Sequence, residues 1–272
     1  MKSIWTLDEV FDEVAGSGTP RNWTAVIPAA GKGSRLGHPL PKILFPILDR
    51  PIAAWIIEGL SEQVHRHVFV LAPEGVDAVE PCLKQELGGN FDIVVQPEPK
   101  GMADAIFRAR KLVRTPFVLV VWGDQVTLSP RTVDACIRLH EYRGNASLTF
   151  PSILKRDPYI HIQRGKDERI TGVLETREKP IPYPVGENDC GLFLFSTEIL
   201  FEILDEALSG RADAGFSTGE INLLPLIPRF DCEPGSVATV RIESEEETLG
   251  VNTQADVLRV SEVLARRVSF SR

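Results

Sequence analysis

Short, continuously apolar runs alternate with helical patterns in the part of the chain that follows residue 22. The apolar runs are residues 24–28, 68–71, 91–96 and 117–122. Helical spacing of apolar residues marks residues 52–60, 103–113 and 131–142. A strand that is apolar along its whole length is buried on both faces, as in a parallel sheet covered by helices. The pattern therefore predicts an α/β fold.

The second half of the chain has a different pattern of predicted strands and helices. Strand-like pieces at 147–150, 159–163, 170–174 and 191–195 follow one another with short polar breaks. They are followed by helical patterns at 198–208 and 220–227, a strand at 237–242 and a helix that begins at Thr253. We expect residues 1–22 to form a helical extension and residues 23–272 to form one domain. Its halves, about 23–145 and 146–272, bind a nucleotide and a second substrate respectively.

Charge and composition exclude several classes of protein. The formal net charge is −8, which disfavours nonspecific binding to nucleic acid or to a membrane surface. The four cysteines form no C-x-x-C pair, so a disulfide framework and a zinc ribbon are disfavoured. The N-terminus has the wrong pattern for a signal peptide, and no apolar run has membrane-spanning length. We expect a cytoplasmic protein, and a homo-oligomer is compatible with the sequence.

A glycine-rich segment with two placed cations follows the first apolar run. Gly31 and Gly33 allow backbone amides to approach phosphate oxygens, while Arg35 and Lys42 supply a bidentate donor and a point charge. The dinucleotide fingerprint G-x-G-x-x-G fails because Gly37 is one position late, and the Walker pattern is absent. Taken alone, such a segment is also compatible with a tight turn between a strand and a helix.

The segment Ala29-Ala-Gly-Lys-Gly-Ser-Arg-Leu-x4-Pro-Lys42 resembles the signature of the sugar nucleotidyltransferases, most closely that of the N-acetylglucosamine-1-phosphate uridylyltransferases. Further resemblances appear in the family's order, over about residues 24–257. They are Gln96-Pro-Glu-Pro-Lys-Gly-Met-Ala103, Trp122-Gly-Asp124, Thr171-Gly-Val-Leu-Glu175, Asp189-Cys-Gly-Leu-Phe193, Gly219-Glu220 and Gly250-Val-Asn252. An ordered series is much more specific than any one motif.

The resemblance implies a Rossmann-like three-layer fold with a mixed, mostly parallel sheet and a smaller sugar-binding subdomain. It implies transfer of a nucleotidyl group from a nucleoside triphosphate to a sugar 1-phosphate, with release of pyrophosphate. Arg35, Lys42 and Asp124 would then be catalytic, and Asp124 and Asn252 would hold Mg²⁺. The implied nucleotide-binding residues are Ala29, Ala30, Gly31, Gly33, Gln96, Gly101 and Met102, and the implied sugar-binding residues are Glu175 and Asp189.

Three of these side chains have a structural alternative. Asn252 could instead cap the next helix, where Thr253 and Asp256 form a capping box. Gln96 has an amide that matches the edge of uracil or thymine, but it could equally be a polar end of a strand. Asp124 follows an apolar run, where open α/β sheets bind ligands, and in isolation it would also suit a turn.

The sequence departs from the uridylyltransferase pattern at three places. Met102 replaces a hydroxyl residue and looks more like the apolar residue of the thymidylyltransferases. Asp189 stands where an asparagine is expected to contact an N-acetyl sugar, and Tyr159-Ile-His161 lacks the glycine of the sugar loop. UTP and dTTP are favoured as donors, but the base and the sugar are left open.

Three other functions share parts of this pattern. A cytidylyl- or guanylyltransferase that acts on an alcohol phosphate, or on another phosphate that is not a sugar, would share the glycine-rich loop. A nucleotide-sugar sensor would bind without turnover, although the presence of Arg35, Lys42 and Asp124 disfavours a catalytically inactive site. A glycosyltransferase is disfavoured because the sequence has no D-x-D motif.

Overall fold

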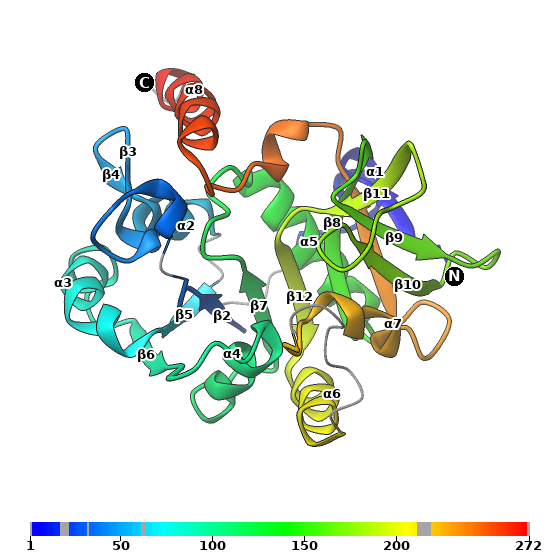
Figure 1. Cartoon of the computed structure of the whole chain (residues 1–272). Helices are drawn as coiled ribbons and strands as arrows, with labels where there is room; N and C mark the ends of the chain where they lie inside the picture. The colour runs from blue at the N-terminus through cyan, green and yellow to red at the C-terminus, as the bar shows by residue number, and fades with distance from the viewer. Residues whose placement is uncertain (1, 17–21, 32, 61–63, 211–218, 271–272) are drawn as a thin grey trace.

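The computed structural model of the chain describes residues 2–16, 22–31, 33–60, 64–210 and 219–270 (Figure 1). A nine-stranded sheet has the order β1-β13-β8-β12-β7-β2-β5-β6, with β11 paired to β8. Its strands are β1 (Ile4–Thr6), β2 (Trp23–Pro28), β5 (Val64–Leu71), β6 (Phe91–Val95), β7 (Phe117–Val121), β8 (Leu148–Arg156), β11 (Val185–Asp189), β12 (Leu192–Ser196) and β13 (Val237–Arg241). The pairings of β12 with β7 and β8, and of β11 with β8, are antiparallel, and the other pairings are parallel. The predicted mixed, mostly parallel sheet is confirmed.

Helices cover both faces of the sheet. Along β2, Ala25 and Ile27 join one buried core, while Val26, which points the opposite way, joins the other. The first core is closed by α1 (Leu7–Glu13), α2 (Ile52–Gly59), α3 (Val76–Leu87), α5 (Pro130–Arg143) and α8 (Gln254–Phe270). The second is closed by α4 (Met102–Arg108), α6 (Thr197–Gly210) and α7 (Ile227–Phe230). This is the three-layer arrangement expected of strands that are apolar on both faces.

A smaller lobe lies beside the end of the sheet that carries β11. Strands β9 (Ile160–Arg164) and β10 (Ile170–Glu175) form an antiparallel pair, on the right in Figure 1. A second small hairpin, β3 (Pro46–Ile47) and β4 (Arg50–Pro51), lies on the other side of the molecule near α2. The β9–β10 lobe corresponds to the smaller subdomain that the sequence predicted.

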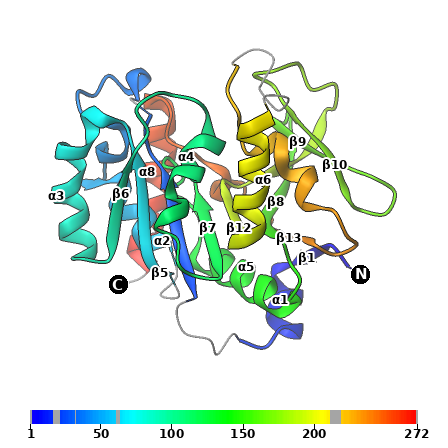
Figure 2. The same ribbon diagram turned by 90° about the horizontal axis from the view of Figure 1, so that it is seen from below.

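The N-terminal segment joins the main sheet. Helix α1 starts at a capping box, in which Thr6 accepts from the Glu9 backbone and Glu9 accepts from the Thr6 backbone. The segment expected to form a helical extension also supplies β1, which pairs in parallel with β13 at the edge of the sheet (Figure 2). On the outer face, Arg131 of α5 contacts Asp8 and the ring of Phe11.

The helix expected at residues 220–227 is largely absent. A short 3-10 helix occupies Leu224–Leu226, and α7 covers only Ile227–Phe230. Pro225 and Pro228 each lie in the first turn of one of these short helices, where a missing N–H costs nothing. Residues 220–223 instead run as a loop toward α4.

Candidate active site

Three strand ends bring the predicted motifs to one edge of the sheet. Strands β2 and β7 are parallel neighbours, so the glycine-rich segment and Asp124, which follow them, emerge side by side. Strand β12 is antiparallel to β7, and its first residue, Leu192, pairs with Val121. The segment that precedes β12, which contains Asp189, therefore reaches the same edge. Open α/β sheets bind ligands at this edge.

Lys42 lies at the centre of a small charged group at this edge. Its Nζ donates to Oδ2 of Asp124 at 2.7 Å and to Oδ1 of Asn252 at 2.9 Å. The Lys42 and Asp124 side chains are only 16% and 24% exposed, so this ion pair is partly shielded from water. Arg35 is exposed and donates to the same Asn252 oxygen at 3.4 Å. Four residues that the sequence analysis selected are thus in one cluster.

The loops after β7 and before α8 are tied together by backbone contacts. An isolated bridge joins Gln125 to Gly250, and the Val251 N–H donates to the Asp124 carbonyl at 3.1 Å. This pairing places Asn252 opposite Asp124. The backbone N–H of Asp256 is capped by the Thr253 hydroxyl at 3.3 Å, so Thr253 takes the capping role. The Asn252 side chain is left to face Lys42.

Gly33 and Lys42 pack closely enough that the glycine is required. Gly33 has φ +62°, and a Cβ built on it would lie 2.8 Å from Cβ of Lys42. A real Cβ does not approach another carbon this closely, so any other residue would push Lys42 away. Gly31 has open space where its Cβ would be, and it lines the cleft.

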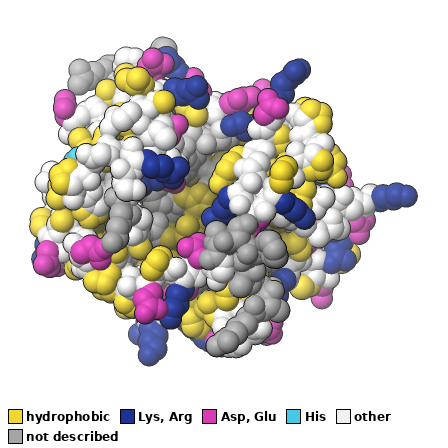
Figure 3. Space-filling model, in the orientation of Figure 1, with side chains coloured by type: hydrophobic (Ala, Val, Ile, Leu, Met, Phe, Trp, Pro, Cys, Tyr) yellow, Lys and Arg dark blue, Asp and Glu magenta, His cyan; other side chains and the backbone are white. Residues whose placement is uncertain are grey.

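A cleft of about 560 Å³ opens in front of this cluster. In Figure 3 the molecule is hollowed between its two lobes, with Lys and Arg groups around the rim. The cleft is lined by Ala29, Gly31, Lys42, Met102, Asp124 and Asn252 on the first lobe, and by Glu175 and Asp189 on the second. Lys42 and Asp124 therefore open onto one shared cleft, as the proposed chemistry requires.

The other predicted nucleotide-binding residues lie beside the cleft. Ala30 lines a neighbouring pocket of about 310 Å³, shared with Ala29 and Gly31. Gln96 is buried, and its amide donates to the Gly101 carbonyl at 3.1 Å and to Asp104 at 2.9 Å. Gln96 thus orders the turn before α4 in this structure, and its contact with a base stays a prediction.

The segment at Gly101 is held against the loop at residues 221–222. Gly101 has φ +103°, and a Cβ there would lie 2.3 Å from the Ile221 carbonyl oxygen. The N–H of Met102 donates to Oδ1 of Asn222 at 3.3 Å. These contacts fix the turn at Gly101 and hold Met102, which lines the cleft.

Glu175 and Asp189 both line the second lobe's side of the cleft. Oε2 of Glu175 is paired with Nε of Arg177 at 2.6 Å, whereas Oε1 is buried and has no hydrogen-bond partner among the described residues. Asp189 accepts from the Gly191 N–H at 2.8 Å. Burial, aided by the negative charge of Glu175, raises the pKa of Asp189 to about 6.

Sequence reasoning missed several side chains that line this part of the cleft. Arg177 and Asn188 each lie within two residues of a predicted site residue, and that proximity was the available signal. Lys155, near the end of β8, donates to the Thr248 hydroxyl at 3.1 Å. Its position gave no signal, because a single lysine in a strand is ordinarily a solvated side chain.

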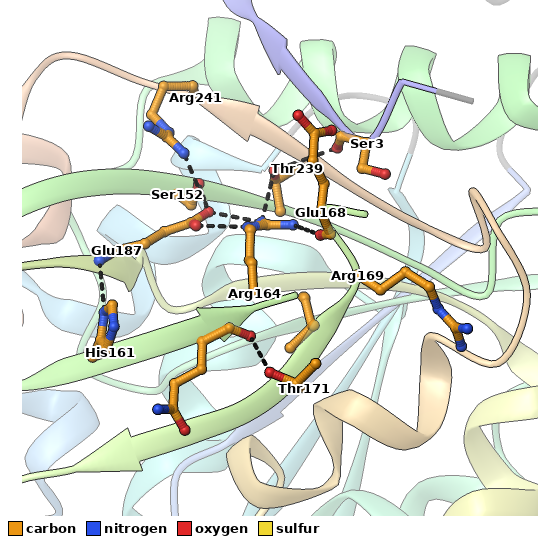
Figure 4. A network of polar contacts seen from close by, with 12 residues as sticks. Ser3, Ser152, His161, Arg164, Glu168, Arg169, Thr171, Glu187, Thr239 and Arg241 are labelled. Carbon is orange, nitrogen blue, oxygen red and sulfur yellow. Dashed lines mark hydrogen bonds and ion pairs between the residues drawn. The ribbon is translucent and has the colours of Figure 1, made fainter. Parts of the chain in front are cut away.

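A buried network of ion pairs and hydrogen bonds around Glu187 holds β11 in place (Figure 4). Arg164 donates to both carboxylate oxygens of Glu187, at 2.7 and 2.8 Å. Ser152 donates to Glu187 at 2.7 Å, and Arg241 lies 3.5 Å away. Burial opposes ionisation of Glu187, but the hydrogen bonds and charge of Arg164 outweigh it, so the pKa of Glu187 is lowered. The strand that ends at Asp189 is therefore anchored to β8, β9 and β13.

Comparison with known proteins identifies the family. Residues 25–208 match the family described as the MobA-like NTP transferase domain. The chain belongs to this family. It is therefore a nucleotidyltransferase, consistent with the shared cleft and its cationic group.

Two curated relatives are each named bifunctional protein GlmU. One from Thermus thermophilus is 32% identical over 248 residues, which cover 89% of this chain and 52% of the relative. One from Exiguobacterium is 27% identical over 251 residues, which cover 90% and 53%. The chain thus spans about half the length of the curated relatives it matches.

A solved structure supports the fold. It is that of a putative glucose-1-phosphate thymidylyltransferase from Bacillus anthracis in complex with sucrose. The TM-score is 0.65, with 90% of this chain and 95% of that chain covered, and the sequence identity is 18%. No helix among the described residues is long and apolar enough to cross a membrane.

Proposed function

We propose that this nucleotidyltransferase transfers a nucleotidyl group from a nucleoside triphosphate to a sugar 1-phosphate, with Mg²⁺, and releases pyrophosphate. The observation that carries the proposal is the convergence of Lys42, Asp124 and Asn252 at the mouth of a cleft whose far wall holds Glu175 and Asp189. The phosphate groups would lie beside Lys42, Asp124 and Asn252, and the hydroxyl-rich part of the acceptor would lie beside Glu175 and Asp189. UTP and dTTP are the favoured donors, on the resemblance of the loop that contains Met102.

The residues present fit Mg²⁺. Oδ2 of Asp124 and Oδ1 of Asn252 both approach one positive centre, Nζ of Lys42, within 2.9 Å. Two converging oxygens that already accommodate a cation are suitable protein ligands for Mg²⁺, which takes one or two protein oxygens and completes its shell with water and phosphates. Mg²⁺ bound there would neutralise charge on the triphosphate.

Positioning and charge neutralisation account for the reaction. An oxygen of the acceptor phosphate attacks the α-phosphorus, a new P–O bond forms, and the bond from the α-phosphorus to the β-phosphate oxygen breaks. A phosphate monoester is mostly dianionic near neutral pH, with a second pKa of about 6, so it needs no general base. Lys42 and Arg35 would offset the repulsion between the two polyanions and stabilise the departing pyrophosphate.

A matrix of substrates tests the proposal. Pyrophosphate release is measured for ATP, CTP, GTP, UTP and dTTP against sugar 1-phosphates and alcohol phosphates, with and without Mg²⁺. We expect release to require both a sugar 1-phosphate and Mg²⁺, and to be fastest with UTP or dTTP. Release with alcohol phosphates alone would favour the cytidylyl- or guanylyltransferase alternative. Binding in a calorimeter without release in any combination would favour a sensor.

Gly33→Ala should impair turnover by displacing Lys42. The added Cβ would lie 2.8 Å from Cβ of Lys42, and a shift of about 1 Å in a positioned group can cost on the order of a hundredfold in rate. Gly37→Ala is the matched control, because Gly37 has φ +64° but has open space around its Cβ position. Both variants should lose about 1 kcal/mol of stability through backbone strain, but only Gly33→Ala should lose activity. Equal pyrophosphate release by the two variants would show that the Gly33–Lys42 contact is unimportant.

A further inference from the structure

The second-lobe end of the cleft holds hydrogen-bond acceptors that lack donors within the described part of the chain. There, Oε1 of Glu175 is buried and has no partner, and its side chain lines the cleft and is only 4% exposed. Oδ1 of Asn188 is also buried and has no partner among the described residues, and Asn188 lines the cleft and is 8% exposed. A buried acceptor without a donor is costly, so such atoms mark where a ligand supplies hydrogen.

The carboxylate of Asp189 lines the same cleft and accepts from the backbone N–H groups of Gly191 and of Asp189 itself. Asn188 and Asp189 are neighbours in β11, where successive side chains leave opposite faces, so the acceptor grouped with Glu175 is Asp189. The charge of Glu175 reaches it and acts with burial to disfavour its ionised form. The two carboxylates therefore repel each other, and a positive group between them would relieve this repulsion.

Arg177 and Lys155, two cations among the described residues that line the cleft, are each already paired. The guanidinium Nε of Arg177 pairs with Oε2 of Glu175, so it leaves Oε1 available. Nζ of Lys155 donates to the hydroxyl of Thr248, in the loop that precedes Asn252. Lys155 and Arg177 both line the cleft, where they also suit the phosphate of an acceptor.

We propose that the phosphate acceptor of this enzyme carries a free primary amine, held as an ammonium group by Glu175 and Asp189. This inference rests on the proposed function. An ammonium group offers three N–H donors and a positive charge, which match two carboxylates. A hydroxyl offers one donor and no charge. An N-acetylated amine also offers one donor, and it adds a carbonyl oxygen that would face other acceptors.

Matched acceptors test the inference with the unmodified enzyme. The value of kcat/KM is measured by pyrophosphate release with glucosamine 1-phosphate, glucose 1-phosphate and N-acetylglucosamine 1-phosphate. A second arm compares phosphoethanolamine with 2-hydroxyethyl phosphate, and so tells an amino sugar from an aminoalkyl phosphate. We expect the amine to be preferred within its arm by on the order of ten- to a hundredfold, since a hydrogen-bonded buried charge makes a contribution of that size.

Asp189→Asn provides the second test. It keeps the shape of the side chain and removes the charge, so the ratio of kcat/KM for amine over hydroxyl acceptors should fall at least about tenfold. The matched control is Asp205→Asn, an exposed carboxylate on α6 that is paired with Arg110, and its ratio should be unchanged. Thermal melting of both variants verifies that they fold.

The outcomes separate the two proposals. Equal or faster turnover of the hydroxyl or N-acetyl acceptors by the wild-type enzyme would overturn the inference and leave the proposed function intact. An unchanged acceptor ratio in folded Asp189→Asn would also overturn it. Absence of pyrophosphate release with every acceptor and triphosphate would overturn both the inference and the proposed function.

Discussion

Asp124→Ala should lower pyrophosphate release by on the order of a thousandfold while the protein stays folded. The carboxylate faces the cleft and receives Lys42 Nζ at 2.7 Å, and its oxygen is one of the two proposed for Mg²⁺. Removing it would leave Asn252 as the remaining proposed metal ligand and as the remaining one of the two acceptors that hold Lys42 Nζ. Pyrophosphate release at saturating substrates, measured over a range of Mg²⁺ concentrations, gives the effect.

The fold should tolerate the loss of Asp124 because its side chain is 24% exposed and its ion pair borders the cleft. We expect a cost in stability of about 1 kcal/mol or less, as for other partly solvated pairs. Asp8→Ala removes a carboxylate that is 85% exposed and paired with Arg131, and it serves as the matched control with normal turnover. At high Mg²⁺, Asp124→Asn should be more active than Asp124→Ala. Its amide oxygen can still bind Mg²⁺, although more weakly than a carboxylate oxygen does. Wild-type release by folded Asp124→Ala would refute the proposed role.

The core of the fold could be predicted because its residues carry their own signal. Strands β2 and β7 are apolar along their length, which identifies strands buried on both faces. The helix expected at 131–142 is α5, and its start has a local cause, because the Ser129 hydroxyl accepts from the Thr132 N–H at 3.1 Å. In these segments, local preference and tertiary burial agree.

Other elements could not be predicted because tertiary contacts override their local pattern. Helix α3 contains Pro81, which normally ends a helix, although the flanking turns here pack Val79 and Leu83 into the core. Strand β11 has the sequence VGEND, which is polar enough for a loop. Its Glu187 is buried because Arg164, about twenty residues away in the chain, neutralises it. A single sequence does not reveal such pairing.

The candidate site shows the same division. Lys42, Asp124 and Asn252 were selected because each lies in a motif, and the structure brings them together. Lys155 lies far from those motifs in the chain, and only the fold places it at the cleft. Residues in motifs can be found from the sequence because they carry the chemistry that the family shares. The residues that surround the acceptor can be found only from the packing of the second lobe.

Arg164→Met should destabilise the protein by about 3–5 kcal/mol, because it leaves the carboxylate of Glu187 buried without its main partner. The two side chains are 13% and 7% exposed and share two hydrogen bonds. The pKa of Glu187 is lowered in the folded protein, so this stabilisation is present at neutral pH and is lost as the pH falls through the lowered value. Urea unfolding at pH 7 measures the loss.

A double variant separates the buried charge from the lost contact. Adding Glu187→Gln to Arg164→Met removes the unpaired charge, so it should recover a substantial part of the loss, a coupling that is read from a double-mutant cycle. Arg110→Met breaks an exposed pair with Asp205 and should cost less than about 1 kcal/mol. Because β11 ends at Asp189, folded Arg164→Met should also show a higher KM for the acceptor with a smaller change in kcat. A loss no larger than that of Arg110→Met would mean that Glu187 is protonated or solvated in the native protein, and that the network does not fix the strand.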